Sequence, residues 1–150
     1  GSVHFGKDYL VFIGFNSYCE IGDMFAFGSR GKLLCYEKIV FGEYVRVGFE
    51  SQIIDSNFHP IIDLKTREIA PLTTPIHIGS YNWVGNRSSI MQKTITPDYC
   101  MIASNSLCNK DYSKHGNNIL IGGIPAKIIR TGISRDWEGE REQLRIWMGV

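Results

Sequence analysis

Histidine is the side chain best suited to move a proton near neutral pH, and this chain has four of them. His4 lies close to the N-terminus, His77 directly precedes an apolar repeat position and is expected to point outward, and His115 belongs to an irregular polar segment. His59 stands where a regular sequence repeat ends and a loop over residues 60–75 begins. Loops of this length in a small domain are usually functional or disordered. We therefore take His59 as the candidate acid–base residue.

The elements that must position His59 are set by a repeat of six residues. Apolar or compact residues recur at this interval in two series: Phe41, Val47 and Ile53, then Ile78, Val84, Ile90, Thr96, Ile102 and Cys108. The residues four positions later are small, β-branched or amides: Val45, Ser51, Asn57, Asn82, Ser88, Thr94, Cys100 and Ser106. Two coupled columns of this kind are difficult to obtain by chance.

A period of six differs from the period of a helix, about 3.6, and from that of a half-buried strand, about 2, and it predicts a parallel β-helix built from triangular coils. The first residue of each hexad would point into the prism, and the small residue would pack inside the corner. Coils stacked about 4.8 Å apart would pair each strand with the strands above and below it. Inward orientation is predicted for Val47, Ile53, Val84, Ile90 and Ile102.

The two series are out of phase. Steps of six from Phe41 reach His59, whereas the second series begins at Ile78, 19 residues later. The interval 60–75 contains three prolines, a charged centre and no hexad spacing. This composition favours an ejected loop rather than another coil.

The N-terminal third repeats less regularly than the centre. Ile13-Gly14, Ile21-Gly22 and Phe27-Gly28 resemble hexad starts. The first two are eight residues apart, however, and residues 31–37 fit the small-residue column poorly. We interpret this part as degenerate coils with bulges.

The C-terminal end shows a different pattern. Ser134 is a suitable cap for a short helix over residues 135–148, a segment rich in helix formers. Trp137, Leu144 and Trp147 would lie on one side of this helix and pack on the rod or on a neighbouring subunit.

Composition agrees with one cytoplasmic domain. The 150 residues are 43% apolar with a net charge of +1. These values fit a β-helix domain over residues 3–132 with a helical extension over residues 133–150, and we expect no nucleic-acid partner. No run of residues is long and apolar enough to span a bilayer, so we expect no transmembrane segment. The four cysteines, at positions 19, 35, 100 and 108, lack metal-type spacing, and we expect them to be buried and reduced.

Three segments together resemble the left-handed β-helix acyltransferases, also called hexapeptide-repeat acyltransferases. They are Asp55-Ser56-Asn57-Phe58-His59-Pro60-Ile61, the restart Pro75-Ile76-His77-Ile78-Gly79-Ser80-Tyr81-Asn82-Trp83-Val84-Gly85, and the closing Gly122-Gly123-Ile124-Pro125-Ala126-Lys127-Ile128-Ile129-Arg130. Within this family the chain is most similar to bacterial sugar O-acetyltransferases of capsule and surface polysaccharides, over roughly residues 10–132. The resemblance implies an all-β, single-stranded left-handed parallel β-helix. It also implies acetyl-CoA as acyl donor, a small-molecule or lipid-linked sugar as acceptor, and a homotrimer with active sites between neighbours.

The resemblance also implies roles for individual residues. His59 would take the proton of the acceptor hydroxyl, while Trp83 and Gly85 would form the pocket of the acyl group and its oxyanion. Contacts with acetyl-CoA are implied for Asn86, Ala103, Ser104, Lys110, Pro125, Lys127 and Arg130, with the cations meeting its phosphates. Contacts with the acceptor are implied for Asp55, Asn57, Ser29 and Arg30, the last two reaching the histidine of a neighbouring subunit.

The chain departs from the family pattern at several of these positions. Ser104 and Asn105 replace smaller residues, Thr96-Pro97 replaces an aliphatic-glycine pair, and residues 111–118 form a longer connection than usual. The departures weaken the expected contacts with the pantetheine arm of coenzyme A and leave the predicted fold unchanged.

Two other functions remain open from the sequence. The same scaffold serves γ-type carbonic anhydrases, which bind zinc through three histidines. His59 and His77 are 18 residues apart, close to one coil, but the phase break places them at different hexad positions. The second alternative is a catalytically silent assembly module, because a fold does not determine a function. The combination of His59, Trp83 and the closing segment favours the acetyltransferase, although nothing identifies the acceptor sugar.

Overall fold

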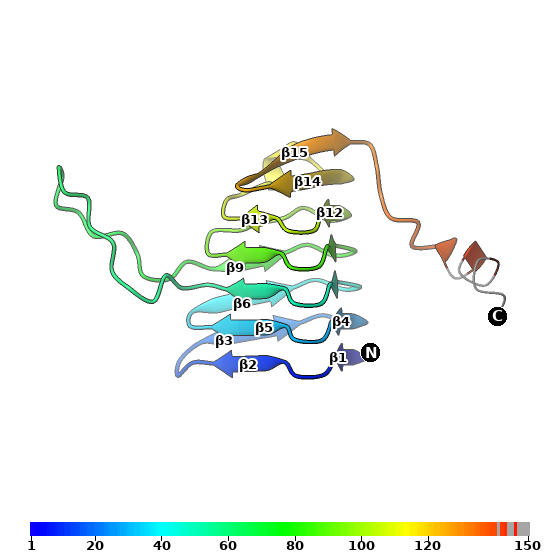
Figure 1. Ribbon diagram of the computed structural model, residues 1–150, viewed down its shortest axis with the longest axis horizontal. Coiled ribbons are helices and arrows are strands. Elements are labelled where there is room, and N and C mark those ends of the chain that lie inside the picture. Colours follow the sequence, from blue (N-terminus) through cyan, green and yellow to red (C-terminus); the bar gives the residue numbers. More distant parts are fainter. Residues whose placement is uncertain (141, 144–145, 147–150) are drawn as a thin grey trace.

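The computed structural model describes residues 1–140, 142–143 and 146, and the described strands form a parallel β-helix (Figure 1). The strands are β1 (Val3–Phe5), β2 (Leu10–Ile13), β3 (Tyr18–Ile21), β4 (Phe25–Phe27), β5 (Lys32–Cys35), β6 (Lys38–Phe41), β7 (Arg46–Val47), β8 (Gln52–Ile54), β9 (Ile76–Ile78), β10 (Trp83–Val84), β11 (Ser89–Met91), β12 (Cys100–Ile102), β13 (Leu107–Cys108), β14 (Ile119–Gly123) and β15 (Ala126–Thr131). A short 3-10 helix, η1 (Ser113–His115), precedes β14.

Successive strands occupy three faces of the rod in turn. The first face has the strand order β1-β4-β7-β10-β12-β14-β15, the second β13-β11-β8-β5-β2, and the third β3-β6-β9. The first corner joins the first face to the second, the second corner joins the second face to the third, and the third corner leads back to the first face. All pairings are parallel except that of β14 with β15.

The predicted hexad register is confirmed. Val47, Ile53, Val84, Ile90 and Ile102 are all at most 5% exposed and belong to one continuous core. Inward residues stack directly because Val47 pairs with Val84, and Val84 pairs with Ile102. The small-residue column is also buried, with the exception of Asn57.

The irregular repeat predicted for the N-terminal third reflects coils that are longer than the upper ones. Leu33 and Cys35 are both fully buried and continue the inner columns. Phe27 pairs with Val47 in this part of the rod, whereas Val84 pairs with Ile102 higher up, so the lower coil is two residues longer. The longer coil breaks the period of six without breaking the inner stack.

The loop over residues 60–75 leaves the rod as a long arm, as predicted (Figure 1). Two antiparallel bridges, Ser56 with Thr73 and Ile62 with Ile69, hold its two sides together. At its tip, Asp63 Oδ1 accepts hydrogen bonds from the N–H groups of residues 65 and 66. These bonds lower the pKa of the Asp63 carboxyl.

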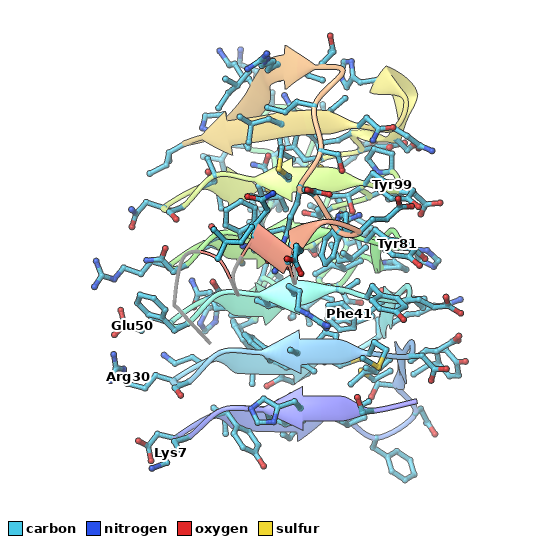
Figure 2. The ribbon with its side chains drawn as sticks, turned by 90° about the vertical axis from the view of Figure 1, so that its right-hand side faces the viewer. Lys7, Arg30, Phe41, Glu50, Tyr81 and Tyr99 are labelled. Carbon is cyan, nitrogen blue, oxygen red and sulfur yellow. The ribbon has the colours of Figure 1, made fainter. Side chains whose placement is uncertain are left out.

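Non-glycine residues with positive φ stack at the corners. The first corner holds Arg30, Glu50, Arg87 and Asn105, with φ between +56° and +59°. The third corner holds Tyr44, Tyr81, Tyr99 and Asn118, with φ between +54° and +60°. This conformation is uncommon for bulky residues, and stacking between coils compensates for it here. Figure 2 shows Arg30 and Glu50 on one edge of the rod, and Tyr81 and Tyr99 on another.

The rod ends differently from the expectation of a helix starting after Ser134. Strand β15 folds back antiparallel on β14, and the Tyr112 hydroxyl, buried below it, donates to the carbonyl of Ala126. Ser134 Oγ bonds the carbonyl of residue 135, and Asp136 caps the next turn by accepting from the N–H of Gly139. Helical conformation is described only for residues 140, 142, 143 and 146. The predicted positions of Leu144 and Trp147 lie outside the described residues.

The described residues contain no helix that is long and apolar enough to cross a membrane. All four cysteines are free thiols, and Cys35, Cys100 and Cys108 are buried. Burial raises the pKa of the Cys100 and Cys108 thiols to about 12.

Candidate functional site

His59 lies at the second corner, where the chain leaves β8 for the arm. Its backbone N–H donates to the carbonyl of Asn57 over 2.7 Å. Phe58 has a φ of +61°, its N–H donates to Ser56 Oγ over 3.0 Å, and its ring packs edge-on against Tyr36. The backbone is therefore held in a tight turn. Within the described part of the chain the exposed imidazole of His59 has no hydrogen-bond partner.

Asp55 anchors this turn to the coil below. Its carboxylate is fully buried and accepts hydrogen bonds from three successive N–H groups: Tyr36 at 2.7 Å, Glu37 at 2.9 Å and Lys38 at 2.9 Å. Both oxygens are thus occupied by backbone donors, so the acceptor contact implied for Asp55 stays a prediction that these hydrogen bonds do not support.

Asn57 is only half-buried and is one of the residues that line a cavity. It was expected to fill the inner corner, a position that Asp55 takes instead. The cavity has a volume of about 400 Å³ and lies over the second face and the second corner. It is lined by Gln52, Asn57, Ser89, Met91, Gln92, Lys93, Leu107 and Asn109. Of the residues that line this cavity, Asn57 is the nearest to His59 along the chain.

Trp83 and Gly85 lie on the first face and at the first corner. The Trp83 ring is 44% exposed, and the guanidinium of Arg135 sits over it at 5.6 Å. Gly85 was expected to give room to an acyl group, but the structure gives a different reason for this glycine. A Cβ at Gly85 would lie 2.5 Å from the backbone nitrogen of Ser104 in the next coil, so the glycine is required by coil stacking.

The backbone donors at this corner are not equivalent. The N–H of Gly85 donates to the carbonyl of Ile102 over 2.7 Å and is therefore occupied. The N–H of Asn86 makes no backbone hydrogen bond among the described residues, while its side-chain oxygen accepts from Ser104 Oγ over 2.6 Å. Asn86, which sequence reasoning placed with coenzyme A, thus carries the free donor that Gly85 lacks.

Ser29 and Arg30 belong to a network of charges along the first corner. Arg30 Nε donates to Glu50 Oε1 over 2.9 Å, and Arg87 Nε donates to Glu50 Oε2 over 2.7 Å. Ser29 Oγ accepts from the N–H of Lys7 in the coil below. The hydrogen bonds from Arg87 and then Arg30 lower the pKa of Glu50. The two residues expected to reach the acceptor therefore already have partners within the rod.

The residues expected to contact acetyl-CoA are distributed over the upper coils. Ala103 and Ser104 lie at the first corner, where the Ala103 carbonyl accepts from Ser106 Oγ over 2.6 Å. Lys110 follows β13, and its ammonium lies 5.6 Å from the centre of the Tyr112 ring. Pro125, Lys127 and Arg130 are exposed on the β14–β15 hairpin. Lys110, Lys127 and Arg130 form no ion pair within the described residues.

One chain does not bring all of these residues together. His59 is at the second corner, whereas Trp83 and Asn86 are on the first face and at the first corner, and the strands of the second face separate them. His77 is exposed on β9 in the third face. Among the described residues no group of three or more His, Cys, Asp or Glu side chains is placed to hold a metal ion.

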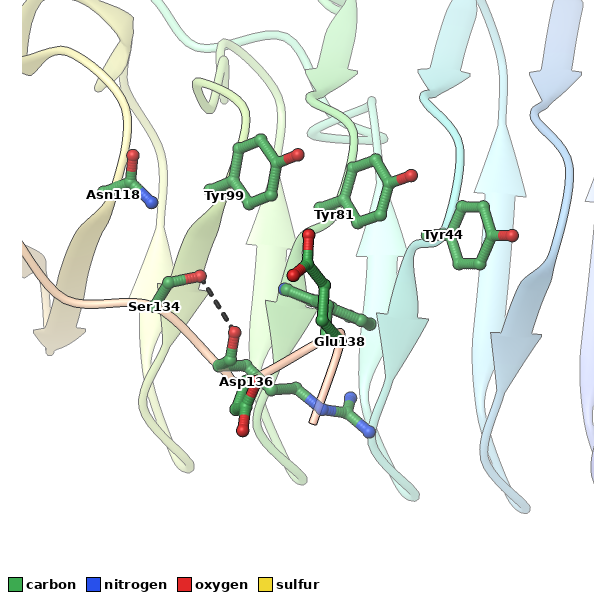
Figure 3. A pocket seen from close by; sticks show the side chains of 9 residues that line it. Tyr44, Tyr81, Tyr99, Asn118, Ser134, Asp136 and Glu138 are labelled. Carbon is green, nitrogen blue, oxygen red and sulfur yellow. Dashed lines mark hydrogen bonds between the residues drawn. The ribbon is translucent and has the colours of Figure 1, made fainter. Parts of the chain in front are cut away.

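Sequence reasoning missed the tyrosines of the third corner. Tyr44, Tyr81 and Tyr99 form a ladder with ring centroids 4.9 Å apart and nearly parallel planes. The C-terminal segment crosses this ladder and encloses a cavity of about 410 Å³ (Figure 3), in which Trp137 meets Tyr81 edge-on. The signal was present, since Tyr81 and Tyr99 are one coil apart. Packing of Trp137 on the rod agrees with the expectation for the C-terminal segment.

Comparisons with known proteins identify the fold. No family model matches the chain, and neither does any curated protein sequence. The solved structure of NeuO, a polysialic-acid-specific acetyltransferase, matches with a TM-score of 0.67 and 22% identity over 92% of this chain and 70% of that one. The structure of a maltose O-acetyltransferase from Clostridium difficile matches with a TM-score of 0.69 and 22% identity, over 89% of this chain and 68% of that one.

A third match is a galactoside acetyltransferase solved in complex with coenzyme A, with a TM-score of 0.66 and 19% identity over 85% of this chain and 64% of that one. These likenesses extend over most of the rod, and they agree with the three faces and parallel pairing described above. The chain therefore has the left-handed parallel β-helix fold that is shared by hexapeptide-repeat acetyltransferases.

Proposed function

We propose that this protein transfers an acetyl group from acetyl-CoA to a hydroxyl of a sugar, with His59 as the general base. The observation that carries the proposal is the exposed imidazole of His59, which lacks a hydrogen-bond partner among the described residues and is held in a tight turn two residues after Asn57. Solved structures with this fold include acetyltransferases named for maltose, a galactoside and polysialic acid. We extend the proposal to a sugar of a bacterial surface polysaccharide, which the two polysialic-acid acetyltransferases among these structures support.

The acceptor hydroxyl must be activated by a general base before it can attack the thioester. An alcohol is a weak nucleophile at neutral pH, so the neutral imidazole of His59 removes its proton as the oxygen attacks the thioester carbonyl. The tetrahedral intermediate then breaks its carbon–sulfur bond. The departing coenzyme A thiolate takes the proton from the imidazolium, and the neutral base is restored.

The negative oxygen of the intermediate needs a fixed donor. The N–H of Asn86 is our candidate, because the N–H of Gly85 is bonded to Ile102. Trp83 would form an apolar wall next to it. The exposed cations Lys110, Lys127 and Arg130 are available for the phosphates of the donor, since they form no ion pair within the described part of the rod.

We propose a homotrimer, and the separation of these groups within one rod supports a site that is shared between neighbouring subunits. His59 and Asn86 lie at different corners of one rod, so a complete site requires His59 from one subunit and Asn86 from its neighbour. Sedimentation should therefore show a trimer. A stable monomer with full transferase activity would contradict this arrangement.

The general-base role is tested by His59→Ala. The side chain is exposed and makes no hydrogen bond among the described residues, so the fold and the binding of acetyl-CoA should be retained. Transfer to the acceptor should fall by roughly 10²- to 10⁴-fold, measured as thiol release from acetyl-CoA.

Lys127→Ala and Arg130→Ala are the matched controls. Loss of a remote phosphate contact should raise the apparent KM for acetyl-CoA without removing the proton transfer. If His59→Ala turned over the acceptor at the parent rate, the catalytic assignment would be wrong.

A further inference from the structure

The third corner carries three stacked tyrosine rings, all of them partly exposed. The ring centroids of Tyr44 and Tyr81, and those of Tyr81 and Tyr99, are 4.9 Å apart, and the ring planes differ by only 5° and 7°. Parallel rings in contact lie about 3.5–4.0 Å apart, so these rings must be slipped sideways by about 3 Å. Each ring therefore overlaps its neighbour only in part and keeps some of its face uncovered.

The C-terminal segment encloses a cavity over this ladder. Residues 134–138 and the three tyrosines line a volume of about 410 Å³ (Figure 3). The ring of Trp137 meets that of Tyr81 at 81°, with the two centroids 5.7 Å apart. The cavity thus has two aromatic walls at about a right angle. Its volume is within the range of small-molecule sites, which is about 300–1,000 Å³.

The lining of this cavity also carries negative charge. Asp136 and Glu138 both belong to it, and Figure 3 shows Glu138 beside the ring of Tyr81. Asp136 is engaged in part, because its Oδ1 accepts a hydrogen bond from the N–H of Gly139 over 2.8 Å. The exposed carboxylate of Glu138 forms no hydrogen bond or ion pair among the described residues. An acidic group next to aromatic faces attracts a cation.

One cation of the protein already belongs to the lining, and its charge is balanced. Arg135 forms an ion pair with Glu140. Its guanidinium lies over the rings of Trp137 and Trp83, at 4.4 and 5.6 Å from their centres. With Glu140 and the two acidic lining residues, three carboxylates accompany one guanidinium. Within the described part of the chain, no cationic side chain lies over the tyrosine ladder.

An organic cation fits this lining better than a metal ion does. A metal ion requires several oxygen, nitrogen or sulfur ligands, and among the described residues no group of three or more His, Cys, Asp or Glu side chains is placed to supply them. Aromatic faces instead favour alkylated ammonium groups, whose charge is spread over several carbons. The carboxylate of Glu138 adds the opposite charge that such a group needs.

We propose that the cavity between the tyrosine ladder and the C-terminal segment binds a small organic cation with an alkylated ammonium group, such as trimethylammonium. The ammonium group contacts the uncovered ring faces of Tyr81 and Tyr99, and Glu138 provides the counter-charge. This site is at the third corner, whereas His59 is at the second and does not line the cavity. The inference is therefore independent of the proposed acetyl transfer.

Choline is the probe, and 3,3-dimethyl-1-butanol is its matched control, because it has the same shape without the charge. Binding of each compound to the whole protein is measured by NMR titration. The indole N–H signal of Trp137, assigned by its loss in Trp137→Phe, reports on the cavity itself and should shift as choline is added. Choline should bind about 5- to 30-fold more tightly than the neutral alcohol.

Substitutions of Tyr99 test the aromatic wall. Tyr99→Leu keeps an apolar side chain but removes the ring, and should weaken the binding of choline about 3- to 10-fold. Tyr99→Phe keeps the ring and should bind choline as the parent does. Tyr99 is at the end of the tyrosine ladder, so the contact of Trp137 with Tyr81 is kept in both variants. Melting curves without ligand verify that both variants are folded.

Substitution of Glu138 tests the counter-charge. Glu138→Gln preserves the shape of the side chain and should weaken the binding of choline about 2- to 5-fold, as expected for the loss of an exposed charge pair. Glu68→Gln is the matched control, because it removes the same charge from the arm, outside this cavity. Its affinity for choline should equal that of the parent.

Three results would overturn the inference. Equal affinities for choline and 3,3-dimethyl-1-butanol would show that the cavity takes apolar groups regardless of charge. An affinity for choline that is unchanged in both Tyr99→Leu and Glu138→Gln would place the cation elsewhere on the protein. Absence of choline binding at millimolar concentrations would show that the tyrosine ladder only holds the C-terminal segment.

Discussion

The carboxylate of Asp55 accepts a hydrogen bond from the backbone N–H of Tyr36 over 2.7 Å. The ring of Tyr36 in turn packs edge-on against Phe58, the residue before His59. One buried side chain therefore fixes the coil below and the turn that presents the proposed base. The proposed active site depends on this anchor although Asp55 has no free oxygen for a substrate.

Replacement of Asp55 by alanine should destabilise the rod strongly. The change leaves three N–H groups, those of residues 36–38, without their acceptor, and the free energy of unfolding should fall by about 3 kcal/mol or more. Denaturant unfolding measures the loss. Asn57→Ala is the control, because that side chain is half-buried and makes no hydrogen bond among the described residues. Equal stability losses for the two variants would contradict the anchoring role.

Gly85→Ala should also destabilise the protein. The new Cβ would meet the backbone nitrogen of Ser104 at 2.5 Å, and backbone cannot move aside as a flexible side chain can. The expected loss is about 1–3 kcal/mol, as for overpacking in a core.

Gly116→Ala separates steric contact from backbone conformation. Gly116 has a φ of +77° and a ψ of 179°, a conformation that is essentially restricted to glycine, but open space around its Cα, so alanine there brings conformational strain of about 1–3 kcal/mol without a steric contact. If Gly85→Ala had the same midpoint of denaturant unfolding as the parent protein, the glycine would not be required by coil stacking.

The ion pairs of Glu50 with Arg30 and Arg87 at the first corner should make the stability of the fold depend on pH. Its ion pairs lower the pKa of Glu50 relative to its usual value of 4.5. A lowered carboxyl pKa in the folded state contributes stability above the usual value, and this contribution is lost as the pH falls through the folded pKa. The contribution is small because the ion pairs are exposed to solvent.

Glu50→Gln tests this dependence. The variant should melt slightly below the parent at pH 7, and the difference should shrink in acid below the usual carboxyl range and in high salt. Melting curves at several pH values provide the measurement. If the difference in melting temperature between Glu50→Gln and the parent grew in acid, the ion pairs with Arg30 and Arg87 would not be the source of the contribution of Glu50.

The cysteines should be unreactive in the folded protein. Burial raises the pKa of Cys100 and Cys108 to about 12 and that of Cys19 to about 11, so thiolate is scarce at pH 8. A thiol reagent should react slowly with the native chain and with four thiols after unfolding in guanidinium. Rapid reaction of several native thiols would contradict the buried positions. Slow reaction also keeps the background low when coenzyme A release is assayed.

The inner columns were predictable from the sequence because they depend on residue type at a fixed spacing. Ile90 must be apolar because it points into the stacked coils. The loop over residues 60–75 is indicated by its prolines and by the loss of the six-residue phase. The position of His59 at the loop junction follows from the same local pattern. These features need no knowledge of which residue lies above or below.

The partners across coils were decided by the tertiary structure. Asp55 and Asn57 both fit a corner by type, and only the register with residues 36–38 shows that Asp55 is inside and Asn57 at the cavity. The reason for Gly85 likewise depends on a backbone group brought close by coil stacking. A periodic sequence specifies which side chains point inward, but hydrogen bonds depend on distances of a few tenths of an ångström, which arise only when coils of unequal length are stacked.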